Sequence, residues 1–72
     1  MTNAKAIPPT GTALADLIER TAGALPMTLK ALLRECDVHW STFARWRLGE
    51  TNPWPRTHQR VLQRIEALWQ NR

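Results

Sequence analysis

The side chains best suited to chemistry in this chain are arginines and tryptophans, and they gather in its second half. Residues 38–72 contain six arginines, two glutamates and all four tryptophans, whereas basic and acidic residues balance in residues 1–37. The whole net charge of +4 therefore lies in residues 38–72. Because the planar guanidinium group binds phosphate through two parallel hydrogen bonds, this half is suited to a polyanionic partner. The alternative is a solvated helical face whose charge serves solubility.

The sequence lacks the residue patterns expected of an enzyme active site or a metal site. Cys36, His39 and His58 are the only good nitrogen or sulfur ligands, and a closed zinc site needs four. One cysteine excludes an internal disulfide and is typical of a reducing compartment. Without a Gly-rich phosphate loop or a carboxylate cluster, we expect no enzyme, no cofactor and no small-molecule ligand. No apolar run approaches the ~18 residues of a membrane span and no signal peptide is visible, which predicts a cytoplasmic protein.

Hydrophobic periodicity predicts an all-α domain over residues 11–72, preceded by a flexible arm over residues 1–10. Apolar residues recur at helical spacing in four segments, over about residues 12–22, 28–36, 40–48 and 56–70. The expected boundary residues are Thr12, as the first N-cap, and Gly23, Asp37 and Gly49, which end the first three helices. No strand pattern or repeat is present, so the expected fold is a small bundle of four to five helices.

The second and third predicted helices are joined by a tight turn, as in a helix-turn-helix. In that motif one helix braces across the phosphate backbone and the next enters the major groove of DNA. The apolar residues expected to lock the two helices together are Leu32, Leu33, Cys36, Val38, Phe43 and Trp46. Spacing alone fits an ordinary helical hairpin equally well.

Residues 28–53 resemble the helix-turn-helix of the phage lambda repressor and Cro-like family, most specifically at residues 41–50, which read STFARWRLGE. Asn52-Pro53 is similar to the loop before the family's fourth helix. The chain departs from the family pattern at Leu33, Asp37 and His39, where Ala, Gly and a Ser or Thr cap are usual. The resemblance implies a lambda repressor-like fold that extends over roughly residues 12–70.

The same resemblance implies a sequence-specific DNA-binding protein that acts as a transcriptional repressor in a bacterium, phage or mobile element. It further implies a homodimer on a palindromic operator in double-stranded DNA, associated with the nucleoid. Two alternatives stay open: a helical protein-binding adaptor or inhibitor that reuses the fold, and a DNA-binding accessory of phage packaging or recombination. Preference for the protein's own upstream region over bulk DNA would separate a repressor from an adaptor.

Helical geometry predicts which side of the third helix reads bases. With Phe43 and Trp46 facing the core, the opposite side carries Ser41, Ala44, Arg45 and Leu48. The predicted base-reading residues are His39, Trp40, Ser41, Ala44 and Arg45. Arg45 is the best of them because arginine donates two hydrogen bonds to guanine O6 and N7. Its alternative is a surface ion pair with Glu50.

Two of these residues have local alternatives. Trp40 either packs on a thymine methyl or the sugar–phosphate edge, or is a partly buried staple against the second helix. Ser41 bonds a base or a phosphate, or satisfies a free backbone donor in its own first turn.

Further residues are expected to hold the phosphate backbone or a second subunit. The predicted phosphate contacts are Thr28, Lys30, Arg47, Thr51, Asn52, Arg56 and Arg60, of which Thr28 and Lys30 follow from the family resemblance. Leu62 and Trp69 lie at one edge of the apolar stripe of the fourth helix and are the predicted dimer contact. The alternative is that the entire stripe is core.

Overall fold

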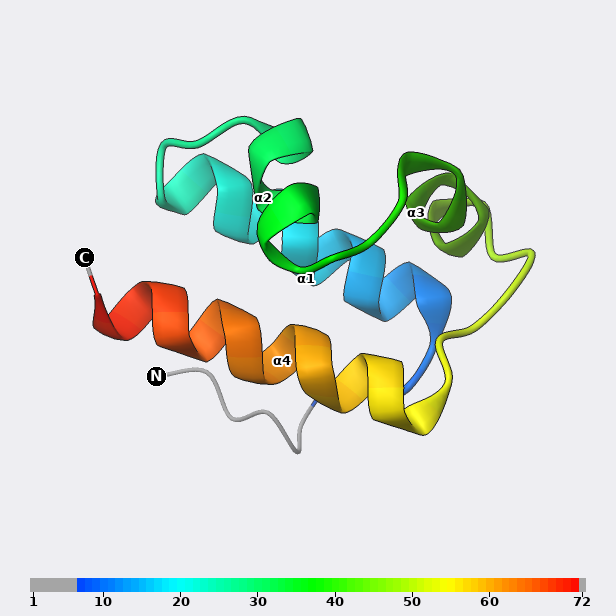
Figure 1. Ribbon diagram of the computed structural model, residues 1–72. Coiled ribbons are helices and arrows are strands. Elements are labelled where there is room, and N and C mark those ends of the chain that lie inside the picture. The colour runs from blue at the N-terminus through cyan, green and yellow to red at the C-terminus, as the bar shows by residue number, and fades with distance from the viewer. Residues whose placement is uncertain (1–6, 72) are drawn as a thin grey trace.

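The computed structural model describes residues 7–71, which fold into a small helical bundle (Figure 1). Its elements are α1 (Gly11–Ala24), α2 (Leu29–Glu35), α3 (Trp40–Arg47) and α4 (Pro55–Gln70). No strand occurs between residues 7 and 71, so the expected all-helical class is confirmed. No helix in this part of the chain is long and apolar enough to cross a membrane. Most of the predicted arm, residues 1–6, lies outside the described residues.

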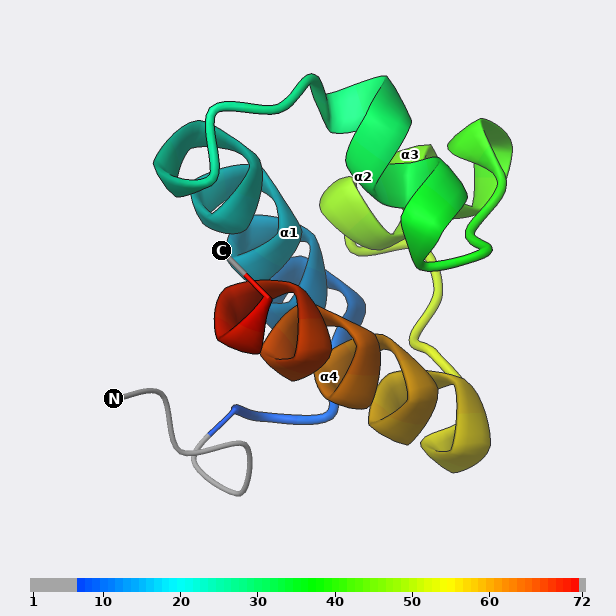
Figure 2. The same ribbon diagram turned by 60° about the vertical axis from the view of Figure 1, so that its left-hand side comes forward.

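The four helices enclose one core. Two views place α2 and α3 together on one side and α4 along the opposite side, while α1 packs against both α2 and α3 (Figures 1 and 2). The largest fully buried side chains are Phe43, Leu14, Ile18, Leu32, Val61 and Cys36. They come from α1, α2, α3, α4 and the end of α2. Every helix therefore contributes to the core that fixes the orientation of α3.

The predicted lock between α2 and α3 is present. All six apolar residues expected there are buried: Leu32, Leu33, Cys36, Val38, Phe43 and Trp46. Removing apolar surface from water stabilises such contacts by about 25 cal/mol per Å². All six belong to one hydrophobic core cluster, which holds α2 and α3 together.

The helices α2 and α3 end in the same hydrogen-bonded arrangement, the Schellman motif. After α2, Asp37 takes a φ of +56°, and the Val38 N–H donates to the Leu33 carbonyl at 2.9 Å. After α3, Gly49 takes a φ of +76°, and the Glu50 N–H donates to the Arg45 carbonyl at 2.9 Å. Asp37 therefore adopts the left-handed backbone that glycine usually supplies, and both predicted helix ends are confirmed.

The boundaries of α1 differ from the prediction. The N-cap is Thr10 and not Thr12, because the Thr10 hydroxyl accepts the Ala13 N–H at 3.2 Å. Gly23 does not end the helix, which continues to Ala24. The stop comes from Pro26, which has no N–H to donate. The Met27 N–H donates instead to the Ala22 carbonyl at 3.1 Å and closes the turn.

Candidate nucleic-acid interface

Burial fixes which side of α3 faces outward. Phe43 and Trp46 are 1% and 2% exposed, as the helical periodicity predicts. Ser41, Arg45 and Leu48 are exposed, and Ala44 is half-buried. The outward side of α3 thus combines one hydroxyl, one guanidinium and two apolar side chains.

The N-terminal end of α3 is organised by His39. Its Nδ1 accepts the Ser41 backbone N–H at 3.2 Å and lies 2.8 Å from the Ser41 hydroxyl. Histidine therefore fills the capping position usually taken by Ser, Thr, Asp or Asn. The Ser41 hydroxyl bonds the His39 ring, so the free backbone donor that Ser41 was expected to satisfy is satisfied by His39.

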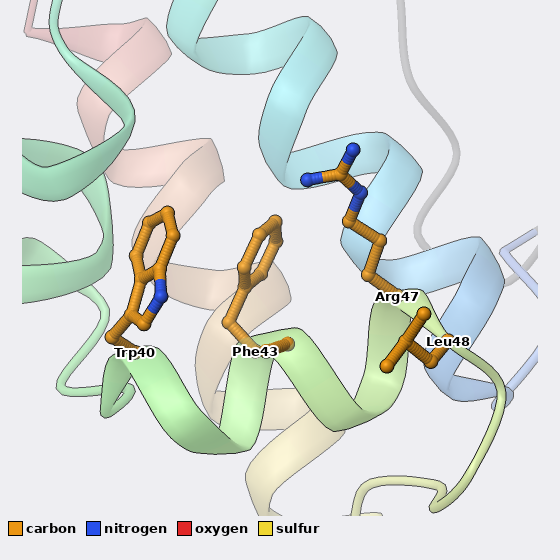
Figure 3. A pocket seen from close by; sticks show the side chains of 5 residues that line it. Trp40, Phe43, Arg47 and Leu48 are labelled. Atoms are coloured by element: carbon orange, nitrogen blue, oxygen red, sulfur yellow. The ribbon is translucent and has the colours of Figure 1, made fainter.

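Trp40 is anchored but remains open to solvent. Its ring centroid lies 5.8 Å from that of Phe43, with the planes tilted by 43°, and 54% of Trp40 is exposed. The two rings and Arg47 extend from the same side of α3 (Figure 3). With Ala44 and Leu48 they line one open pocket. The contact with Phe43 fixes the indole at the edge of the proposed base-reading surface.

Leu48 was not among the predicted site residues. It is 72% exposed, which makes it one of the most exposed large apolar residues. The signal that could have found it is its spacing. It follows Trp40 and Ala44 at four-residue intervals, so the three residues form one stripe along the helix.

The arginines fall into two groups. Arg45, Arg47 and Arg56 are exposed, and their side chains make no hydrogen bond or ion pair within residues 7–71. The considered ion pair between Arg45 and Glu50 does not form. These three guanidinium groups are therefore available to a ligand.

Arg60 and Arg64 have structural partners. The Arg60 guanidinium donates to the Asp37 carbonyl at 3.2 Å, and Arg64 forms an ion pair with Glu35. Both bonds join α4 to the end of α2. Arg60, a predicted phosphate contact, thus holds the turn between α2 and α3 in place.

Two other predicted phosphate contacts also hold the fold. The Thr28 hydroxyl accepts the Ala31 N–H at 3.0 Å and caps α2. The Asn52 side-chain oxygen accepts the Gly11 N–H at 2.9 Å and ties the loop after α3 to the start of α1. Lys30 and Thr51 are exposed, and their side chains bond to nothing in the described part of the chain.

The remaining candidates lie elsewhere. Leu62 and Trp69 of α4 are half-buried and pack against the core, as the alternative of an all-core stripe requires. Cys36 is buried, and this burial raises the pKa of its thiol to about 11. Within residues 7–71, no three His, Cys, Asp or Glu residues lie together as metal ligands would.

Comparisons of the chain with protein-family models, curated proteins and solved structures found no match.

Proposed function

We propose that this protein binds double-stranded DNA in a sequence-specific manner, with α3 in the major groove, and represses transcription. The observation that carries the proposal is the pair of unpartnered arginines, Arg45 and Arg47, on a helix whose outward side is free of acidic residues. A helix about 10–12 Å across fits the major groove, which is about 12 Å wide. In this arrangement Arg45 donates to guanine O6 and N7.

Phosphate contacts would come from the residues around α3. Arg56 at the start of α4 and Lys30 in the first turn of α2 are exposed and unpartnered within the described residues. Thr51 lies in the loop that follows α3, close to Arg47 in the chain. These cations and donors would position the domain on the duplex, whereas α3 supplies the discrimination between bases.

We further propose that a homodimer binds a palindromic operator. The eight residues of α3 are about 12 Å long, which corresponds to roughly four base-pair steps of about 3.4 Å. So short a site recurs throughout a genome, and a second copy of α3 about 34 Å away restores selectivity.

The decisive experiment measures binding of the wild type, Arg45→Ala and Arg20→Ala to the gene's own upstream region in the presence of bulk competitor DNA. Arg20 is an exposed α1 residue paired with Asp16, so its variant has the same charge change on a different helix. Arg45→Ala is expected to lose about 1–3 kcal/mol of specific binding, and Arg20→Ala much less. Neither change is expected to lower the thermal midpoint.

Equal effects of the two variants would contradict a base contact at Arg45. A collapse of thermal stability in Arg45→Ala would show a structural role and a different groove-facing side. Preference for other DNA over the upstream region would favour an accessory of packaging or recombination.

Salt dependence tests the phosphate contacts separately. With about three phosphates neutralised per subunit, by Lys30, Arg47 and Arg56, log affinity should fall by ~0.9 per phosphate for each log unit of salt. Arg56→Ala should reduce this slope by about one while leaving sequence preference unchanged. A flat salt dependence would favour the protein-binding adaptor, whose supporting observation is the exposed apolar surface of Trp40 and Leu48.

A further inference from the structure

The helix α3 exposes more apolar surface than an arginine contact to guanine requires. Trp40 and Leu48 are among the most exposed large apolar residues, and Ala44 lies midway between them. These three residues, here called the apolar strip, line one open pocket on α3 (Figure 3). The core contacts of α3 are already made by Phe43 and Trp46. The strip is therefore free to contact a partner.

Positive charge borders the apolar strip on both sides. Arg47 lines the same pocket, and Arg45 lies on the other side of the strip by helical geometry. Neither guanidinium has a partner within residues 7–71, so an occupant of the strip must combine apolar groups with negative charge. In the major groove, the 5-methyl group of thymine is the apolar group on the base edges, and phosphates border the groove.

We propose that the apolar strip recognises thymine 5-methyl groups, so that each half-site combines thymines with the guanine bound by Arg45. This inference rests on the proposed DNA-binding function. From Trp40 to Leu48 the strip rises by eight residue steps, or about 12 Å, so the contacted thymines lie within roughly four base-pair steps. Trp40 and Leu48 mark the two ends of this interval, and the small Ala44 lets the helix approach the bases closely.

The test uses duplexes that differ by single methyl groups. The wild-type protein first selects a binding site from a pool of random duplexes, and each thymine of the site is then replaced by deoxyuridine. Deoxyuridine pairs as thymine does and lacks only the 5-methyl group. Each contacted methyl should contribute about fourfold in affinity, and the sensitive positions should fall within four consecutive steps.

Substitutions in the apolar strip show which residue contacts each thymine methyl group. At the position contacted by Leu48, the Leu48→Ala variant should bind thymine and deoxyuridine equally. At every other sensitive position it should still prefer thymine. Thr42→Ala is the matched control, because Thr42 is exposed on the same helix but does not line the pocket. It should keep every thymine preference of the wild type. Leu48 is exposed, so circular dichroism should show an unchanged fold.

The outcomes separate this inference from the function on which it rests. Specific binding that is insensitive to every deoxyuridine replacement would overturn the thymine contact and leave the DNA-binding function intact. A Leu48→Ala variant that keeps full thymine discrimination would also overturn it. If no duplex is selected over bulk DNA, the proposed function fails, and the apolar strip is then the surface for a protein partner.

Discussion

The side chain of Asn52 is joined to the backbone of Gly11 across 41 positions of the chain. The Asn52 Oδ1 atom accepts the Gly11 N–H at 2.9 Å, in a part-buried place where the loop after α3 meets the first residue of α1. This N–H is one of the helix-terminal donors that no carbonyl within the helix can satisfy. The bond therefore fixes the C-terminal end of α3 relative to α1.

Asn52→Ala is expected to lower the free energy of unfolding by about 1–2 kcal/mol, because the Gly11 N–H is left unsatisfied. Asn52→Asp keeps the acceptor and places negative charge at a helix N-terminus, so stability should be retained. Urea denaturation of both variants checks this. Loss of stability in neither variant would show that the bond contributes nothing measurable.

Gly11 and Gly23 lie in the same helix, and replacement by alanine should have opposite effects. A Cβ on Gly11 would clash with the Thr51 carbonyl oxygen and with the Trp46 Cα, both backbone atoms. A Cβ on Gly23 would meet nothing within 4 Å. Gly11→Ala should therefore cost about 1–3 kcal/mol by overpacking.

The matched variant Gly23→Ala, in the last turn of α1, should stabilise the protein by up to about 1 kcal/mol, since alanine loses less backbone entropy than glycine in a helix. Thermal melts of the two variants and the wild type measure both signs in one experiment. Stabilisation by Gly11→Ala would show that α1 and the loop after α3 can separate without cost.

Local signals predicted the helices well. The segments expected at residues 28–36 and 40–48 correspond to α2 (Leu29–Glu35) and α3 (Trp40–Arg47). Asp37 and Gly49, which follow the C-caps of α2 and α3, are residue types that tolerate the left-handed backbone, so the ends of both helices could be predicted locally. The miss at Gly23 has a local cause too, because a glycine ends a helix only where a left-handed backbone is needed, and α1 continues past it.

The structural roles of Asn52 and Arg60 could not be read from the sequence. Their partners lie 41 and 23 positions away, and no periodicity links them. Both residues were predicted to contact phosphate, since an exposed amide or guanidinium looks the same in sequence whether it meets DNA or a backbone carbonyl. The His39 cap, by contrast, bonds a residue two positions away and has a local signal.

The buried thiol of Cys36 predicts a pH dependence of stability. Burial, the largest cause, raises its pKa from 9.0 to about 11, and Arg64 partly opposes this shift. Between these values the unfolded chain loses the thiol proton while the folded chain keeps it. The unfolded state then binds fewer protons, so the free energy of unfolding should decrease from about pH 9 to pH 11, by at most about 1.4 kcal/mol per pH unit.

Cys36→Ala isolates this contribution, because the other titrating groups are common to both proteins. Alanine leaves a cavity, so the variant should be less stable at pH 8 by an amount that shrinks as pH rises. Urea denaturation at pH 8, 9 and 10 measures the difference. A stability gap that stays constant over this range would contradict the raised pKa.

The proposed homodimer makes a prediction about the edge of α4 that carries Leu62 and Trp69. Both residues pack partly on the core, so Leu62→Glu with Trp69→Glu should weaken the fold as well as any dimer. Gln59 and Gln70 are exposed and, by helical geometry, lie about 60° and 80° beyond Leu62 on the solvent side of the same edge. Gln59→Glu with Gln70→Glu should therefore leave the thermal midpoint unchanged and place like charges across a two-fold interface.

Sedimentation with and without a palindromic duplex decides where the dimer contact lies. The wild type is expected to sediment as a dimer on the duplex. The variant with Gln59→Glu and Gln70→Glu is expected to sediment as a monomer on a single half-site. If the variant with Gln59→Glu and Gln70→Glu remains dimeric, the protein is a dimer whose contact does not include Leu62 and Trp69. A wild type that stays monomeric at high micromolar concentration, with the palindrome present, would remove the homodimer altogether. Leu62 and Trp69 would then serve the core alone, as their packing against it already allows.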